Sequence, residues 1–273
     1  SYKAYFPSWE GFVAYAATND SDQESHQGSY EFNMTRSFEK AIELARIGWL
    51  EKAAELKLNV QANITKMLQY HERESWRHEL TGHGIDVAAF CNGEPECFLM
   101  RETEITQGKG NRTVNILINC RLCGGISGES IIEAGTDLLF YISTLEVNGY
   151  RVQIDVAILN SGYHDKNTAI IVRLKSFKDF LDIPRLAFCL AHPAFPRRLG
   201  FAVKELMPPK WIKALKAYLN GSYGKTPLWD WQEEIMKGYD VYFYTEQLVN
   251  SGKIGRQEVI RENLEKFGIK VKA

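Results

Sequence analysis

One segment in the middle of the chain constrains the fold more than any other. Residues 113–119 (TVNILIN) and 151–159 (RVQIDVAIL) are rich in β-branched side chains and predict two strands. The stretch 129–146 between them has apolar residues at helical spacing and ends before Asn148 and Gly149. Two strands joined through a helix run parallel, and the crossover is right-handed in almost every protein. The chain is therefore expected to contain a parallel sheet with a helix packed against it.

A third strand is expected soon after the second one. Residues 160–162 (NSG) open a turn, and residues 168–174 (TAIIVRL) are again apolar and β-branched. A short polar turn favours antiparallel pairing of the strands that it joins. We therefore predict an α/β fold with a mostly parallel sheet, one antiparallel edge strand and helices on both faces.

Helices are predicted before this central segment. Ser37 is a candidate N-cap of a helix that ends at Gly48, and residues 50–75 predict a second helix. Residues 78–110 are interrupted by glycines and a proline, so only short irregular strands and turns are expected there.

The C-terminal third alternates helices with one further strand. The strand candidate is residues 240–244 (DVYFY), and the predicted helices are 177–190, 194–206, 209–219 and 255–267.

Three regions are expected along the chain. They are an N-terminal extension (1–27), a helical and irregular N-terminal region packed on the core (28–111) and the α/β core (112–273). A chain of 273 residues with 45% hydrophobic residues can bury a sizeable core.

Charge and cysteine content narrow the function classes. The chain has 33 Lys plus Arg against 34 Asp plus Glu, so a nucleic-acid role would depend on a local basic patch. Five cysteines, an odd number, favour a reducing compartment over a disulfide framework. No stretch approaches the roughly 20 apolar residues that span a bilayer, and the first residues lack the apolar core of a secretory signal. We expect a cytosolic protein with no membrane partner.

The order of the central elements resembles the opening of a von Willebrand factor A domain. The stretches TVNILIN, CRLCGGIS, YRVQIDVAIL and TAIIVRL, with a helix after the second, match its strand, metal-holding loop, helix, strand and returning antiparallel strand. The wider pattern is similar to a family of tailed-bacteriophage proteins over residues 37–49, 93–99 and 185–203. The resemblance implies a von Willebrand A-like core, a phage origin and action in the host cell cytoplasm. It supplies no activity.

The metal-holding loop of that family is altered in this chain. A von Willebrand A domain holds Mg²⁺ with an Asp-x-Ser-x-Ser loop, because a hard cation needs oxygen ligands. The equivalent positions here are Asn119, Arg121 and Cys123. A cationic side chain and a thiol cannot replace a carboxylate and a hydroxyl at a magnesium site, so neither a metal nor another cofactor is expected at this loop.

The glycine-rich turn after the first central strand is the first candidate site. Ligands of open α/β sheets bind at the carboxyl ends of the strands, and this turn lies there. The candidate partner-binding residues are Arg121, Gly124, Gly125 and Ser127. The favoured function is a non-enzymatic adaptor that binds a host or phage protein; no catalytic residue is assigned.

A basic and aromatic stretch between residues 204 and 225 supports an alternative function. Cations beside stacking aromatic rings are typical of proteins that bind single-stranded nucleic acid. The candidate residues are Lys210, Trp211, Lys213, Lys216 and Tyr218. A solvated amphipathic helix explains the same pattern, with Trp211 on its core face.

The cysteines leave a third function open. Cys120 and Cys123 form a C-x-x-C pair, which could be redox-active or could bind zinc together with Cys91 and Cys97. The favoured interpretation is structural, since free cysteine behaves as a small buried hydrophobic residue. A metal-dependent hydrolase is the third function considered.

Overall fold

The computed structural model describes most of the chain, and its contacts divide it into two compact units. The first unit comprises residues 1–60 and 111–273, and the second comprises residues 61–110. Residues 1–60 thus share a unit with the α/β core. The described residues are 1–20, 23–55, 72–82, 84–105, 112–217 and 229–269.

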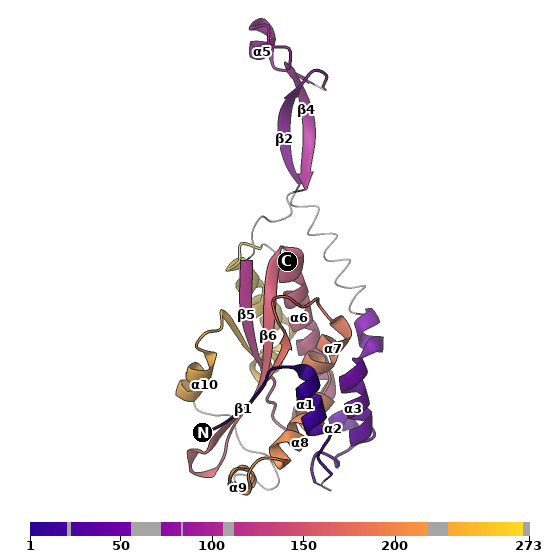
Figure 1. Ribbon diagram of the computed structural model, residues 1–273, viewed down its shortest axis with the longest axis vertical. Helices are drawn as coiled ribbons and strands as arrows, with labels where there is room; N and C mark the ends of the chain where they lie inside the picture. Colours follow the sequence, from indigo (N-terminus) through magenta and orange to yellow (C-terminus); the bar gives the residue numbers. More distant parts are fainter. Residues whose placement is uncertain (21–22, 56–71, 83, 106–111, 218–228, 270–273) are drawn as a thin grey trace. The chain divides into compact units, whose positions relative to one another are not determined.

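The first unit contains a five-stranded, mostly parallel sheet (Figure 1). The central strand β5 pairs in parallel with β6 on one side and with β8 on the other, and β6 pairs antiparallel with β7. The α/β class and the mostly parallel sheet are therefore confirmed. In spatial order the strands are β1 (Tyr2–Phe6), β7 (Asn167–Lys175), β6 (Tyr150–Ser161), β5 (Arg112–Asn119) and β8 (Val241–Tyr244).

The antiparallel strand is not at the edge of the sheet, so that part of the expectation was wrong. Strand β1 pairs in parallel with the outer side of β7, from Tyr2 opposite Thr168 to Phe6 opposite Val172. The side chains of β1 alternate between half-buried and exposed, as in an edge strand with one covered face. The first residues, expected to be an extension, are therefore part of the sheet.

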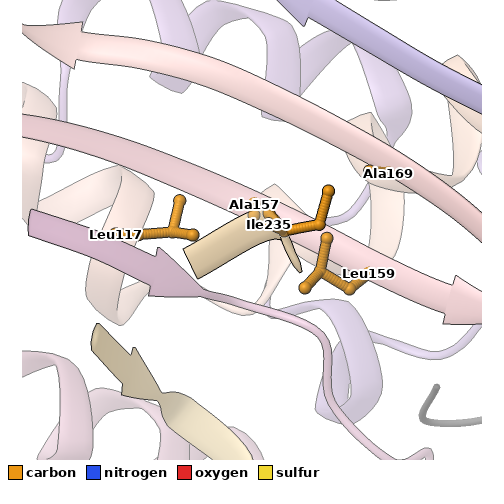
Figure 2. Close-up of a cluster of buried hydrophobic side chains, with 5 residues drawn as sticks. All are labelled: Leu117, Ala157, Leu159, Ala169 and Ile235. Atoms are coloured by element: carbon orange, nitrogen blue, oxygen red, sulfur yellow. The ribbon is translucent and has the colours of Figure 1, made fainter. Parts of the chain in front are cut away.

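Helices cover both faces of the sheet. Neighbouring residues of a strand point to opposite faces, and in β8 these residues are Tyr242 and Phe243. The Phe243 ring packs edge-on against Tyr141 of α6, with ring centroids 5.0 Å apart. Tyr242 packs on the other face against a cluster that includes Ile235 of α10. Figure 2 shows that cluster, formed by Leu117, Ala157, Leu159, Ala169 and Ile235.

The long helix α6 approaches α7 closely. A Cβ atom at Gly135 of α6 would overlap the carbonyl oxygen of Leu190 and the backbone of Ala191, so only glycine fits there. The described helices of the first unit are α1 (Trp9–Ala16), α2 (Tyr30–Asn33), α3 (Phe38–Ile47), α6 (Gly128–Val147), α7 (Ile183–Ala191), α8 (Gly200–Glu205), α9 (Pro209–Lys216), α10 (Trp229–Met236), α11 (Thr245–Asn250) and α12 (Gly252–Glu265), with a 3₁₀ turn at Tyr163–Asp165 and a π-helical turn at Phe195–Leu199.

Several helix boundaries differ from the expected ones. The helix capped by Ser37 and ended by Gly48 is confirmed as α3. The helix expected over 177–190 begins only at Ile183, because Asp182 caps it and Pro184 occupies its first turn. The helix expected over 194–206 is divided into the π-helical turn and α8.

The second unit contains a three-stranded antiparallel sheet in the order β2, β4, β3. Strands β2 (Glu72–Glu79) and β4 (Phe98–Ile105) pair over eight residues each, and β3 (Gly84–Ile85) pairs with the other side of β4. Helix α5 (Val87–Cys91) lies beyond the ends of β2 and β4 (Figure 1). The helix expected over 50–75 is confirmed at residues 50–55 and wrong at residues 72–75, while residues 56–71 lie outside the described part of the chain.

None of the described helices is long and apolar enough to cross a membrane.

Candidate functional site

The loop of residues 120–127 follows β5 at a topological switch point of the sheet, where successive connections leave to opposite sides. From β5 the chain passes through α6 to β6 on one side, whereas β8 lies on the other side of β5. Such a switch point is where open α/β sheets bind their ligands, at the carboxyl ends of the strands. Helix α11 starts at Thr245, directly after β8, at the same edge. The loop thus lies where the sequence analysis placed it.

Asn119 fixes the first end of this loop. It is the last residue of β5 and is completely buried. Its Oδ1 accepts hydrogen bonds from the backbone N–H groups of Arg121 (3.1 Å) and Leu159 (3.4 Å), and its Nδ2 donates to the hydroxyl of Tyr242 (3.2 Å). One amide thereby connects β5 with both neighbouring strands. Burial raises the pKa of Tyr242 to about 12, so its hydroxyl stays protonated and donates to Gln232.

Arg121 connects the loop to the start of α11. Its Nη1 donates to Oε2 of Glu246 at 2.7 Å, and the hydroxyl of Tyr244 donates to the same carboxylate oxygen at 3.1 Å. Both charged side chains are mostly buried. The guanidinium therefore supports the loop from inside the protein, and its proposed contact with a partner stays a prediction.

Arg197 fixes the other end of the loop. Its guanidinium is buried and donates to the carbonyl oxygens of Phe32 (2.6 Å) and Ile126 (2.5 Å). It also lies over the Phe32 ring, 4.0 Å from the centroid. Burial lowers the pKa of Arg197 to about 10, which leaves it charged at neutral pH. Ser127 then caps α6 by accepting the N–H of Ser130.

The middle of the loop is open to solvent. Cys123, Gly124 and Gly125 are exposed, and a Cβ atom at either glycine would meet no other atom within 4 Å. The loop therefore has two fixed ends and an exposed centre. The structure brings all four candidate residues to this edge, with Arg121 and Ser127 in supporting positions and the glycines exposed.

Lys204, which the sequence analysis counted in the basic stretch of residues 204–225, is instead a buried amine near the same edge, and its place at this site was missed. Its Nζ donates to Oδ1 of Asn160, close to the end of β6, at 3.3 Å. Burial, together with the nearby positive charge of Arg121, lowers the pKa of Lys204 to about 7. A lysine titrating near neutral pH at a strand end is a typical functional-site feature. Its position among the apolar residues of a helix was the available signal.

The alternative nucleic-acid surface lies on α9. Lys210, Lys213 and Lys216 are exposed, while Ala214 and Leu215 on the other side are buried. Trp211 of the same helix is half-buried with its ring centroid 6.0 Å from that of Tyr2, and Tyr218 lies outside the described residues. The structure thus places the three lysines along one exposed face and Trp211 against β1.

The four cysteines of the proposed zinc site are divided between the two units. Cys91 and Cys97 belong to the second unit, whereas Cys120 and Cys123 belong to the first, and all are free thiols. Burial raises the pKa of Cys120 to about 12, so it remains a protonated thiol. Among the described residues, no group of three or more His, Cys, Asp or Glu side chains is placed to hold a metal ion.

Comparison with known proteins identifies one family. Residues 1–271 match a family model described as a domain of unknown function, DUF7192. A search of curated proteins and a search of solved structures each found no match. Since the match covers nearly the whole length, the chain belongs to the DUF7192 family.

Proposed function

We propose that this protein is a non-enzymatic adaptor that binds another protein through the loop of residues 120–127. The observation that carries the proposal is the combination of two fixed ends and an exposed centre. Asn119 and Arg197 hold the ends by hydrogen bonds, and Gly124 and Gly125 project no side chain that could shield the backbone. A loop already held in place loses little conformational freedom when a partner binds, which favours affinity. Loops on a rigid sheet commonly carry binding function.

The resemblance to a degenerate von Willebrand A-like core, itself part of this proposal, supports the assignment. The order of strand, loop, helix, strand and antiparallel strand from β5 to β7 follows that family, with β8 on the other side of β5. In that family the loop holds a metal ion with oxygen ligands. Here Arg121 brings a positive charge to the loop and pairs with Glu246. A loop with its own fixed cation needs no metal to present its backbone.

The partner is a host or phage protein, and the place of action is the host cytoplasm. Both statements rest on the resemblance to tailed-bacteriophage proteins.

Bulky substitution in the loop tests the proposal. Gly124→Trp and Gly125→Trp add a large side chain at exposed positions where a Cβ atom meets no other atom within 4 Å, so we expect the fold to be preserved. The tagged full-length protein and both variants are recovered from infected cells after nuclease treatment, and bound proteins are identified by mass spectrometry. We expect one partner to be retained by the unmodified protein and reduced by about tenfold or more with either variant.

The control is Lys178→Trp. Lys178 is exposed and follows β7 at the opposite edge of the sheet, so this variant should retain the partner. Equal recovery with the loop variants and the control would exclude the loop as the binding site.

Binding of single-stranded nucleic acid through α9 is the second candidate. The observation that favours it is the run of three exposed lysines on a helix without Asp or Glu, with the Lys210 amine 5.6 Å from the Trp211 ring centroid. The test measures binding of a labelled oligothymidylate at increasing salt concentration. Affinity should fall steeply with salt and should weaken in a Lys210→Glu, Lys213→Glu variant. No binding at low salt excludes this function.

A further inference from the structure

The second unit carries large apolar side chains that no other described residue covers. We call residues 78–82 and 84–97 the tip; they comprise the last two residues of β2, β3, α5 and the segments that connect them to β4. Val87 and Phe90 are neighbours on α5, three residues apart, with 69% and 61% of their surfaces exposed. Leu80 and Ile85 are exposed by 63% and 50%. Helix α5 buries only Ala89, so its outer face has no partner within the described chain. Clustered exposed apolar residues commonly mark interaction sites.

The tip is an ordered structure held by hydrogen bonds. The carboxylate of Asp86 accepts the N–H groups of Ala88 (3.0 Å) and Ala89 (3.2 Å), which caps α5. The second carboxylate oxygen of Asp86 lies 3.0 Å from Nε2 of His78 on β2. The backbone N–H of Asp86 donates to the carbonyl oxygen of Cys97 (2.9 Å). These bonds tie α5 to the strands. The apolar side chains are therefore presented on a defined surface.

The charges around these side chains define the chemistry of the partner. The sequence from 78 to 97 contains Glu79, Asp86, Glu94 and Glu96 but neither lysine nor arginine, and Glu79 pairs with the adjacent Arg77 at 2.7 Å. Glu94 and Glu96 are exposed. An acidic surface repels nucleic acid and anionic lipid, and it complements a protein surface that carries Lys or Arg.

We propose that the tip is a docking surface for a protein whose contact area is apolar and bordered by Lys and Arg side chains. The apolar side chains of α5 and its neighbours bury against the partner, and the carboxylates around them set its orientation and favour its approach. This surface shares no residue with the loop of residues 120–127. It gives the protein a second interaction surface, so the failure of one proposal leaves the other intact.

Selection from a library of short random peptides tests the tip. The full-length protein is immobilised, bound peptides are sequenced, and the dissociation constants of individual peptides are measured by fluorescence polarisation. We expect the selected peptides to combine aromatic or aliphatic residues with Lys or Arg. Phe90→Ser and Val87→Ser should each weaken binding by about tenfold or more, as expected for a central apolar contact. Glu94→Lys with Glu96→Lys should also weaken it, and added salt should lower affinity for the unmodified protein.

The matched control is Ile254→Ser. Ile254 lies on α12 in the first unit and is 82% exposed, so this variant makes the same kind of apolar-to-polar change elsewhere. It should bind the peptides with unchanged affinity, and circular dichroism should show that all variants remain folded.

Three results would overturn the proposal. The first is that the selected peptides bind the Phe90→Ser and Ile254→Ser variants equally well or contain no basic residues. The second is binding to phosphatidylcholine vesicles that depends on Phe90, which would assign the tip to a lipid surface. The third is self-association in sedimentation equilibrium that Phe90→Ser abolishes, which would assign it to a second copy of this chain.

Discussion

The guanidinium of Arg121 lies 2.7 Å from the carboxylate of Glu246, and this ion pair joins the loop after β5 to the helix that follows β8. Arg121 follows β5 and Glu246 follows β8, and these two neighbouring strands flank the topological switch point of the sheet. The pair is mostly shielded from water, so removing one partner leaves an uncompensated charge and costs more than breaking a surface salt bridge. It makes the conformation of the proposed binding loop depend on the pairing of β5 with β8.

Removing this ion pair should destabilise the protein measurably. Glu246→Gln leaves the Arg121 guanidinium with a neutral partner and is expected to lower the free energy of unfolding by about 1–3 kcal/mol. Urea unfolding measures the loss, and the double variant with Arg121→Met should lose less than the sum of both single variants. Glu43→Gln is the control, because the Lys40–Glu43 pair is exposed and should contribute about 0.5 kcal/mol or less.

Stability should fall in mild acid because of His192. This residue is buried between α7 and the π-helical turn, and its Nδ1 accepts the N–H of Ala194, which only the neutral ring can do. Burial lowers the pKa of His192 to about 4, below its unfolded value of about 6.5. The unfolded chain therefore binds the proton first, and the stability present above pH ~6.5 is lost as the pH falls towards ~4.

The measurement compares urea unfolding of the protein with that of His192→Asn, which keeps a hydrogen-bond acceptor. The unmodified protein should lose up to about 3 kcal/mol more than the variant over this pH range. Parallel pH profiles for the two proteins would show that His192 does not carry the effect.

Substitution by alanine should reduce stability at Gly135 and leave it nearly unchanged at Gly124. Gly135→Ala places a methyl group against the backbone of α7 and is expected to lower the free energy of unfolding by about 1–3 kcal/mol. Gly124→Ala places it in open space and should change stability by no more than about 0.5 kcal/mol. Thermal or urea unfolding of both variants measures the two changes in the free energy of unfolding. A similar loss at both positions would mean that the centre of the loop is packed.

The sequence predicted strands β5, β6, β7 and β8 of the sheet and missed the edge strand β1. Strands β5, β6 and β7 and helix α6 were found because long β-branched runs and helical spacing are local signals. Strand β1 was missed because five residues carry little periodicity and its partner β7 lies about 165 positions away. The charged segment ERESWRHE has helical propensity, but pairing with β4 makes it strand β2.

The candidate site was located by sequence but its supports were not. The glycine-rich turn follows a recognisable strand, so its place at the sheet edge could be inferred. Glu246 and Arg197 reach that loop from positions more than 70 residues away, and only tertiary packing brings them there. Arg197 in particular is a charged residue that is buried, against the usual preference of arginine for the surface.

The most direct test of the central claim is site-specific cross-linking from Cys123 to the recovered partner. Cys91 and Cys123 are the exposed cysteines and the remaining three are buried, so in a Cys91→Ser variant a maleimide-benzophenone reagent should label Cys123. The control is Lys178→Cys in a Cys91→Ser, Cys123→Ser background, which places the same label at the opposite edge of the sheet. The adaptor account predicts a covalent adduct with the partner from Cys123 and none from position 178. An adduct from position 178 alone, or none from Cys123 while the partner stays bound, would contradict it.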